Sequence, residues 1–209
     1  MNKVLLKSFI IITFLNLFFL KAYTQNFDID LLRKINLERN TNLDGTMKFV
    51  SNTEGVIGVG VPFSFVAVAL IEKDEKLLEK GINMSLALVT NTVNTFMIKH
   101  LVNRQRPANT YPDIDAYKSD RYLSFPSGHT SNAFCTVTTL TLNFPKWYIA
   151  IPAYTWAGTV AYSRMHLGMH YPSDVFAGAL LGIGSSYITF KANQYLKRYY
   201  YTKQILRDF

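Results

Sequence analysis

The chain has 209 residues, of which 49% are hydrophobic, and carries a formal net charge of +8 at pH 7. This length suits one domain with a sizeable core and does not favour two. The single cysteine, Cys135, excludes an intrachain disulfide and a cysteine-based metal cluster. The positive charge suits an anionic partner, which by charge alone could be a phosphate group, an acidic lipid headgroup or a nucleic acid.

Residues 1–24 have the features of an export signal. Lys3 and Lys7 give a positive start, residues 8–20 form an apolar stretch, and Ala22 and Thr24 are small residues at plausible cleavage positions. The alternative is an uncleaved N-terminal anchor, although thirteen apolar positions are short for a membrane span. In both cases residues 25–209, which we expect to form a single domain, begin on the far side of the cytoplasmic membrane.

An amphipathic lead at residues 27–51 precedes five segments that contain no Asp, Glu, Lys or Arg. Each has 16 to 18 residues, and they are residues 55–71, 81–98, 130–145, 147–163 and 175–190. A soluble amphipathic helix keeps a charged face, so this absence of charge favours membrane helices over the alternative, a soluble bundle with unusually apolar helices. We predict an all-α, membrane-embedded bundle of about five to six helices, in which the GxxxG spacing of Gly178 and Gly182 allows two helices to approach closely.

Counting the five segments as membrane spans brings their polar ends to one face. If residue 25 lies outside, the second segment ends outside, the third begins outside, the fourth ends outside and the fifth begins outside. The basic tail after residue 190 then lies inside, as the positive-inside tendency prefers. Three polar clusters that are separated in the sequence therefore meet on the outer side.

The first two clusters carry groups that can bind an anion. KHLVNRQRP, residues 99–107, holds Lys99 and Arg106 seven positions apart, so we expect both on one side of a helix that Pro107 stops. Alone, it would also fit an ordinary basic helix end. FPSGHTS, residues 125–131, places Ser127 and Gly128 at a helix start, where backbone amides can bind an oxyanion. The alternative is an N-cap by Ser127, with a polar His129 at the water interface.

The third cluster, SRMHLGMHYPSD at residues 163–174, contains two histidines four positions apart. A zinc pair of the HExxH type is disfavoured, because Leu167 stands where a glutamate is needed and Pro172 is expected to begin a new helix. Instead, Asp174 can bond one ring nitrogen of His170 and leave the other nitrogen able to attack. The alternative for this pair is capping of the last helix.

Combined, the clusters predict phosphoryl transfer. A transferring phosphoryl group carries charge on its oxygens, which Lys99, Arg106, Arg164 and the amides of Ser127 and Gly128 can stabilise. Two histidines then complete a covalent mechanism, in which one attacks phosphorus and the other protonates the leaving oxygen and later activates water. Since cationic side chains take the place of a metal, we expect no metal ion and no cofactor.

The three clusters together resemble the tripartite signature of the type 2 phosphatidic acid phosphatase (PAP2) superfamily. Every signature position matches: Lys99-x6-Arg106-Pro107, Pro126-Ser-Gly-His129, and Ser163-Arg164-x5-His170-x3-Asp174. The resemblance implies a PAP2 or chloroperoxidase-like helical core within residues 25–209. It also implies that His170 is a nucleophile forming a phosphohistidine, Asp174 its orienting partner and His129 the general acid and base. The implied phosphate-binding residues are Lys99, Arg106, Ser127, Gly128 and Arg164.

The function we expect is that of a bacterial lipid phosphatase in the inner membrane, with its active site facing the periplasm or exterior. Candidate substrates are undecaprenyl diphosphate, phosphatidic acid, phosphatidylglycerol phosphate and a lipid A phosphate. Alternatives are a soluble exported acid phosphatase of broad specificity, a vanadium haloperoxidase and a catalytically silent membrane scaffold. The expected partners are the phosphorylated lipid and the membrane, without nucleic acid, and the sequence predicts no oligomeric state.

Other polar residues near the signature have no assigned role in this scheme. We expect His100 and His166 to be structural or interfacial, and Arg104 to be a phosphate neighbour without a defined function. The segment 108–122 is expected to overhang the pocket and to influence which substrate is chosen. Its alternative is a solvated loop.

Overall fold

A computed structural model describes residues 26–118 and 122–205, and the side chains up to residue 199. The predicted leader at residues 1–24 lies outside these ranges. The described residues are helical and contain no strand, which confirms the predicted all-α class of about five to six helices. After a helical segment at residues 26–37, the elements are η1 (Thr41–Leu43), α2 (Asp44–Glu72), α3 (Glu75–Val102), α4 (Pro107–Thr110), α5 (Gly128–Asn143), α6 (Trp147–His166) and α7 (Pro172–Ile205).

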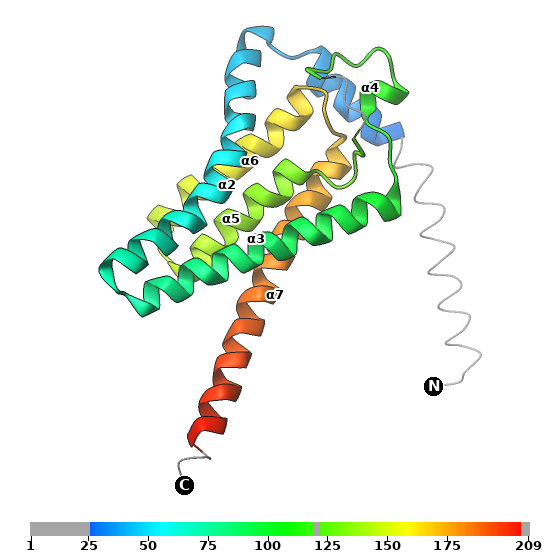
Figure 1. Cartoon of the computed structure of the whole chain (residues 1–209). Helices are drawn as coiled ribbons and strands as arrows, with labels where there is room; N and C mark the ends of the chain where they lie inside the picture. Colours follow the sequence, from blue (N-terminus) through cyan, green and yellow to red (C-terminus); the bar gives the residue numbers. More distant parts are fainter. Residues whose placement is uncertain (1–25, 119–121, 206–209) are drawn as a thin grey trace, which may run out of the picture.

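Four of the five long helices contain an uncharged segment completely, and α5 covers residues 130–143 of the segment 130–145. The five helices pack side by side, with α5 among the others (Figure 1). The element α2 begins at Asp44, so the last eight residues of the predicted amphipathic lead belong to this helix. The 34 residues of α7 span roughly 50 Å, and its carboxyl-terminal part projects beyond the other helices (Figure 1).

The end of α3 differs from the prediction. This helix ends at Val102, because Asn103 adopts a left-handed conformation with φ of 50° and returns its N–H to the carbonyl oxygen of Lys99 at 2.9 Å. Asn is one of the few residues that tolerate this conformation. Arg106 therefore lies on extended chain beyond the helix. The expectation that Lys99 and Arg106 share one helical face is wrong.

The helices α5 and α7 pack at very short distance, as the GxxxG spacing predicted. A Cβ atom on Gly178 would stand 2.6 Å from the carbonyl oxygen of Ser127, and one on Gly182 would collide with the carbonyl oxygen of Ser131. Only glycine permits this approach. The contact holds the start of α5 against the first turns of α7, so that Ser127 and Asp174 become neighbours: the N–H of Ser127 donates to the carbonyl oxygen of Asp174 at 2.9 Å.

Many polar side chains lie in the interior of the bundle beside a small apolar cluster, whereas large apolar side chains cover much of its outside. Ser131 donates to Asn91 at 2.8 Å, and Asn91 donates to Asn132 at 2.9 Å, so this interior is hydrogen-bonded. Exposed apolar residues lie along α2, α3, α6 and α7. Among the residues that the structure describes, two helical stretches, Thr41–Glu72 and Pro172–Tyr199, are long and apolar enough to cross a membrane.

Candidate active site

A cavity of about 480 Å³ lies where α3 ends and α5 begins. Its lining residues are Phe96, Lys99, His100, Arg106, Tyr122, Leu123, Gly128, His129 and His170. Five of the eight site residues expected from the sequence are among them. The other three, Ser127, Arg164 and Asp174, are buried beside it. The structure thus brings the three sequence clusters together at one end of the bundle.

A tight turn between α6 and α7 places His170. The N–H groups of Met169 and His170 both reach the carbonyl oxygen of Arg164, at 2.9 and 3.3 Å. Gly168 has φ of 63°, and a Cβ atom there would stand 2.8 Å from the carbonyl oxygen of Asp115, so the turn requires glycine. Pro172 then begins α7, as predicted. The imidazole of His170 is held with almost no exposed surface, at the wall of the cavity.

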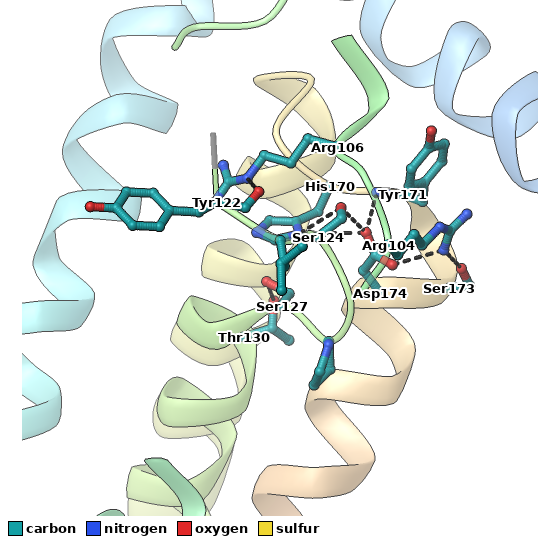
Figure 2. A network of polar contacts seen from close by, with 12 residues as sticks. Arg104, Arg106, Tyr122, Ser124, Ser127, Thr130, His170, Tyr171, Ser173 and Asp174 are labelled. Atoms are coloured by element: carbon teal, nitrogen blue, oxygen red, sulfur yellow. Dashed lines mark hydrogen bonds and ion pairs between the residues drawn. The ribbon is translucent and has the colours of Figure 1, made fainter. Parts of the chain in front are cut away.

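Asp174 lies behind His170, in the first turn of α7. Its Oδ2 atom is 3.5 Å from His170 Nδ1, accepts the backbone N–H of Tyr171 at 3.0 Å and accepts the hydroxyl of Ser124 at 2.5 Å. Ser124 Oγ also lies 3.4 Å from His170 Nδ1 (Figure 2). Since Nδ1 faces this carboxylate and hydroxyl, Nε2 lies on the opposite side of the ring, which is the side of the cavity.

Arg104 occupies the other side of Asp174 rather than the phosphate neighbourhood expected from the sequence. Its guanidinium donates to Asp174 Oδ1 at 2.8 Å and to Ser173 Oγ at 2.7 Å (Figure 2). It also donates to Asp28 Oδ2 at 2.6 Å. The same group stacks 3.7 Å from the centre of the Tyr171 ring. Because both carboxylates are buried, the guanidinium of Arg104 offsets their charge and holds them in place.

Burial lowers the pKa of His170 to about 4, against the opposing hydrogen bond and charge of Asp174. The positive charges of Arg164 and Arg106 lower the pKa of this histidine further. Near pH 7 the imidazole is therefore neutral and has a lone pair on one nitrogen. This is the state that a nucleophile needs.

Lys99 is already hydrogen-bonded to the chain segment that precedes α5. Its ammonium donates to the carbonyl oxygens of Pro126, Leu123 and Ser124, at 2.7, 2.8 and 3.4 Å. The first two bonds fix this segment, while the third is long and weak, so it is the one that an anion can replace. Arg106 also holds the segment, through its Nε–H bond to the carbonyl oxygen of Tyr122 at 3.1 Å.

The amino-terminal end of α5 presents backbone N–H groups, although not the ones first expected. The N–H of Ser127 is taken by Asp174, and the first bond of the helix runs from Ser131 to the carbonyl oxygen of Ser127 at 3.0 Å. The amides of Gly128, His129 and Thr130 therefore precede the first helix bond. Ser127 makes no capping bond with its side chain, which instead accepts the Thr130 hydroxyl at 3.0 Å.

Two residues of α2 contact the side chains of the expected site. Glu54 Oε2 lies 4.0 Å from His129 Nε2, and the carboxylate is buried. Ser51 accepts a bond of 2.6 Å from Arg164 Nη1. The first helix of the bundle thus supports both His129 and Arg164, which the sequence alone did not suggest.

The two histidines left outside the predicted set have different surroundings. His166 is buried away from the cavity, and its Nε2 atom lies 2.8 Å from Asp44 Oδ1. This contact joins the end of α6 to the start of α2. His100 lines the cavity, with Nδ1 bonded to the carbonyl oxygen of Phe96 at 2.8 Å.

The sequence profile of the PAP2 superfamily matches residues 80–198, and the chain belongs to this superfamily. An undecaprenyl-diphosphatase of Sulfolobus acidocaldarius is 32% identical over 164 residues, covering 78% of this chain and 77% of that protein. A lipid A 4'-phosphatase of Bacteroides thetaiotaomicron is 34% identical over 108 residues, covering 49% of this chain and 48% of that protein. The chain is thus a phosphatase of the PAP2 type.

Two solved structures share the fold. The crystal structure of Aquifex aeolicus LpxE superposes with a TM-score of 0.68 at 31% identity, covering 79% of this chain and 95% of that one. A transmembrane PAP2 type phosphatidylglycerolphosphate phosphatase from Bacillus subtilis superposes with a TM-score of 0.71 at 24% identity, covering 84% of this chain and 89% of that one. The second likeness concerns the fold alone. The predicted PAP2-type helical core is confirmed.

Proposed function

We propose that this protein is a metal-independent lipid phosphatase that works through a phosphohistidine on His170. The observation that carries the proposal is the setting of this imidazole: Nδ1 faces Asp174 and Ser124, while the other side of the ring borders a cavity lined by Lys99 and Arg106. A buried neutral imidazole held in this way is an activated nucleophile beside an anion site.

In the first step, the lone pair of His170 Nε2 forms a bond to phosphorus as the bond from phosphorus to the leaving oxygen breaks. His129 gives its proton to that oxygen. In the free protein, burial and the charges of Arg164, Arg106 and Lys99 lower the pKa of His129 to about 3. A phosphate dianion in the cavity offsets these cations and so favours the protonated His129 that this step needs. The positive charge that develops on His170 is stabilised by Asp174.

In the second step, His129 is neutral and takes a proton from water. The water oxygen bonds to phosphorus as the P–N bond breaks, which returns the electron pair to His170 and releases inorganic phosphate. At the end of this step His129 is protonated again and His170 is neutral again.

The phosphate oxygens are bound by cations and by N–H groups in this scheme. Lys99 exchanges its 3.4 Å bond for a phosphate oxygen, and the amide of Gly128 donates from the start of α5. The guanidinium of Arg106, which lines the cavity, donates a hydrogen bond to a phosphate oxygen. Arg164, which is buried beside the cavity, adds a positive charge. Ser127 contributes its hydroxyl hydrogen, because its oxygen already accepts from Thr130.

A lipid substrate is supported by the edge of the cavity. Phe96 and Tyr122 both line it, yet 63% and 73% of their surfaces are exposed. An apolar chain attached to the bound phosphate can lie over these rings and along α3. The names of the relatives, an undecaprenyl-diphosphatase, a lipid A phosphatase and a phosphatidylglycerophosphatase of Bacillus subtilis, point to the same class of substrate.

We place the enzyme in the inner membrane, with the cavity on the periplasmic or outer side. Residues 25–209 form its single domain in this proposal. The export signal or anchor proposed for residues 1–24 supports this orientation, as does the basic carboxyl-terminal tail. Residues 108–118 and Tyr122 then face the outer headgroup region, where they select among lipid phosphates.

The test is phosphate release by the detergent-purified protein in the presence of EDTA. The substrates are undecaprenyl diphosphate, phosphatidic acid, phosphatidylglycerol phosphate, a lipid A phosphate and p-nitrophenyl phosphate, with His170→Gln as the blank. We expect the wild type to hydrolyse at least one lipid far faster than the soluble ester. Equal rates for the soluble ester would refute lipid selectivity, and activity that only a divalent ion restores would refute metal independence.

A further inference from the structure

A second cavity, of about 410 Å³, lies at the end of the bundle away from the active site. It is formed by the first turns of α3, the last residue of α5 and the part of α7 near the point where this helix leaves the bundle (Figure 1). The lining residues are Lys76, Glu79, Lys80, Asn83, Asn143, Phe190, Asn193, Gln194 and Lys197. The proposed phosphatase reaction uses none of them.

The cavity has an excess of positive charge. Three lysines and one glutamate line it, which leaves two positive charges in excess. Glu79 pairs with Lys197, and Lys80 stacks 4.2 Å from the centre of the Phe144 ring. Three amides of the first turn of α3 are already satisfied, since Asp74 accepts the N–H groups of Lys76 and Leu77 with its side chain and that of Leu78 with its backbone oxygen. An anion here would be bound by the lysine side chains and not by the helix terminus.

Asn83 indicates a second property of the ligand, a hydrogen-bond donor. This residue is only 3% exposed, it lines the cavity, and its Oδ1 atom has no hydrogen-bond partner within the described part of the chain. A buried carbonyl oxygen without a donor is unfavourable. A ligand that places a hydroxyl group at this point would satisfy it, so the cavity combines an anion site with an acceptor for a hydroxyl donor.

The helix faces next to the cavity change from polar to apolar. On α7 the positions 197, 194 and 190 line the cavity, and the same face continues toward the active site with Tyr187 and Ile183. On α3 the face that carries Lys76, Lys80 and Asn83 continues with Leu86. These three apolar side chains are exposed. Such a surface fits a molecule with an anionic head and apolar chains better than it fits free phosphate.

We propose that this cavity binds the headgroup of an anionic, hydroxyl-bearing phospholipid such as phosphatidylglycerol. The phosphodiester lies among Lys76, Lys80 and Lys197, a glycerol hydroxyl donates to Asn83 Oδ1, and the acyl chains lie over Leu86 and Tyr187. The site is structural or regulatory, and it does not depend on the proposed catalytic mechanism.

The test is native mass spectrometry of the full chain with equal amounts of phosphatidylglycerol and phosphatidylcholine. We expect the wild type to retain phosphatidylglycerol preferentially, and the preference to fall about fivefold for each lysine in Lys76→Gln and Lys80→Gln. The matched control is Lys146→Gln, which removes an exposed lysine at the same end but outside the cavity, and should change nothing. Equal retention of the two lipids, or the same loss in the control, would overturn the proposal.

Two further experiments test whether the bound phosphate belongs to a lipid and whether the glycerol hydroxyl contributes to binding. Inorganic phosphate added at millimolar concentration should not displace the lipid, and displacement would show a site for the free anion. Asn83→Leu should still prefer both anionic lipids to phosphatidylcholine but should no longer prefer phosphatidylglycerol to phosphatidylmethanol, which lacks the hydroxyls. An unchanged preference in Asn83→Leu would contradict the role given to this side chain. Melting curves of each variant verify that it is folded.

Discussion

Replacing Arg104 by glutamine should slow turnover about 10- to 100-fold and leave KM close to the wild-type value. The guanidinium makes a charge-assisted bond of 2.8 Å to Asp174, and such bonds contribute about 1.5–3 kcal/mol. Without it, the carboxylate that orients His170 keeps only Ser124 and the amide of Tyr171. KM should not change, because Arg104 does not line the cavity.

The assay is steady-state hydrolysis of the preferred lipid phosphate by Arg104→Gln, Arg104→Lys and the control Arg33→Gln. Arg33 also ties the 26–37 segment to the rest of the protein, through an exposed pair with Asp113 at 2.8 Å, but it does not contact Asp174. The control should retain wild-type rates, and the lysine variant should recover part of kcat. A raised KM with unchanged kcat in Arg104→Gln would refute this reasoning and make Arg104 a phosphate ligand.

Two other predictions follow from the geometry. Between pH 6.5 and about 4, His170 is protonated in the unfolded chain but neutral in the folded protein, so folding becomes less favourable as the pH falls. The melting temperature of the ligand-free wild type should therefore fall faster with decreasing pH than that of His170→Gln. Parallel curves for the two proteins would contradict the low pKa of His170. Gly182→Ala should lower both the melting temperature and kcat, because its methyl group meets the backbone of α5, at a cost of about 1–3 kcal/mol. The control Gly184→Ala, which meets nothing within 4 Å, should be neutral, and equal effects of the two variants would argue against the close α5–α7 contact.

The five long helices could be predicted from the sequence because charge is absent from five long stretches. This signal is independent of tertiary contacts. Helix ends were less predictable, as α3 shows: Pro107 is the obvious stop, but Asn103 ends the helix earlier by adopting a left-handed conformation. Asn has only a modest tendency to adopt this conformation, so the surrounding fold determines whether the helix ends there.

The residues that support the site could not be found from the sequence pattern. Arg104 lies in a basic cluster in which its partner is not apparent, because Asp28 and Asp174 approach it from distant parts of the chain. Ser124 and Glu54 have no motif of their own and become relevant only through the packing of α2, α5 and the turn before α7. The signature predicts which groups meet phosphate, whereas tertiary structure decides which groups hold them.

The most direct test of the central claim is to trap the phosphorylated enzyme. In His129→Ala the second step lacks its base, while p-nitrophenyl phosphate needs no acid to lose its leaving group. This variant should release a burst of about one nitrophenolate per chain and then stall. Mass spectrometry after an alkaline quench should locate phosphate on His170, and the double variant His129→Ala/His170→Gln should show no burst. Phosphate on another residue, or steady turnover without a covalent intermediate, would contradict the assignment of His170 as the nucleophile.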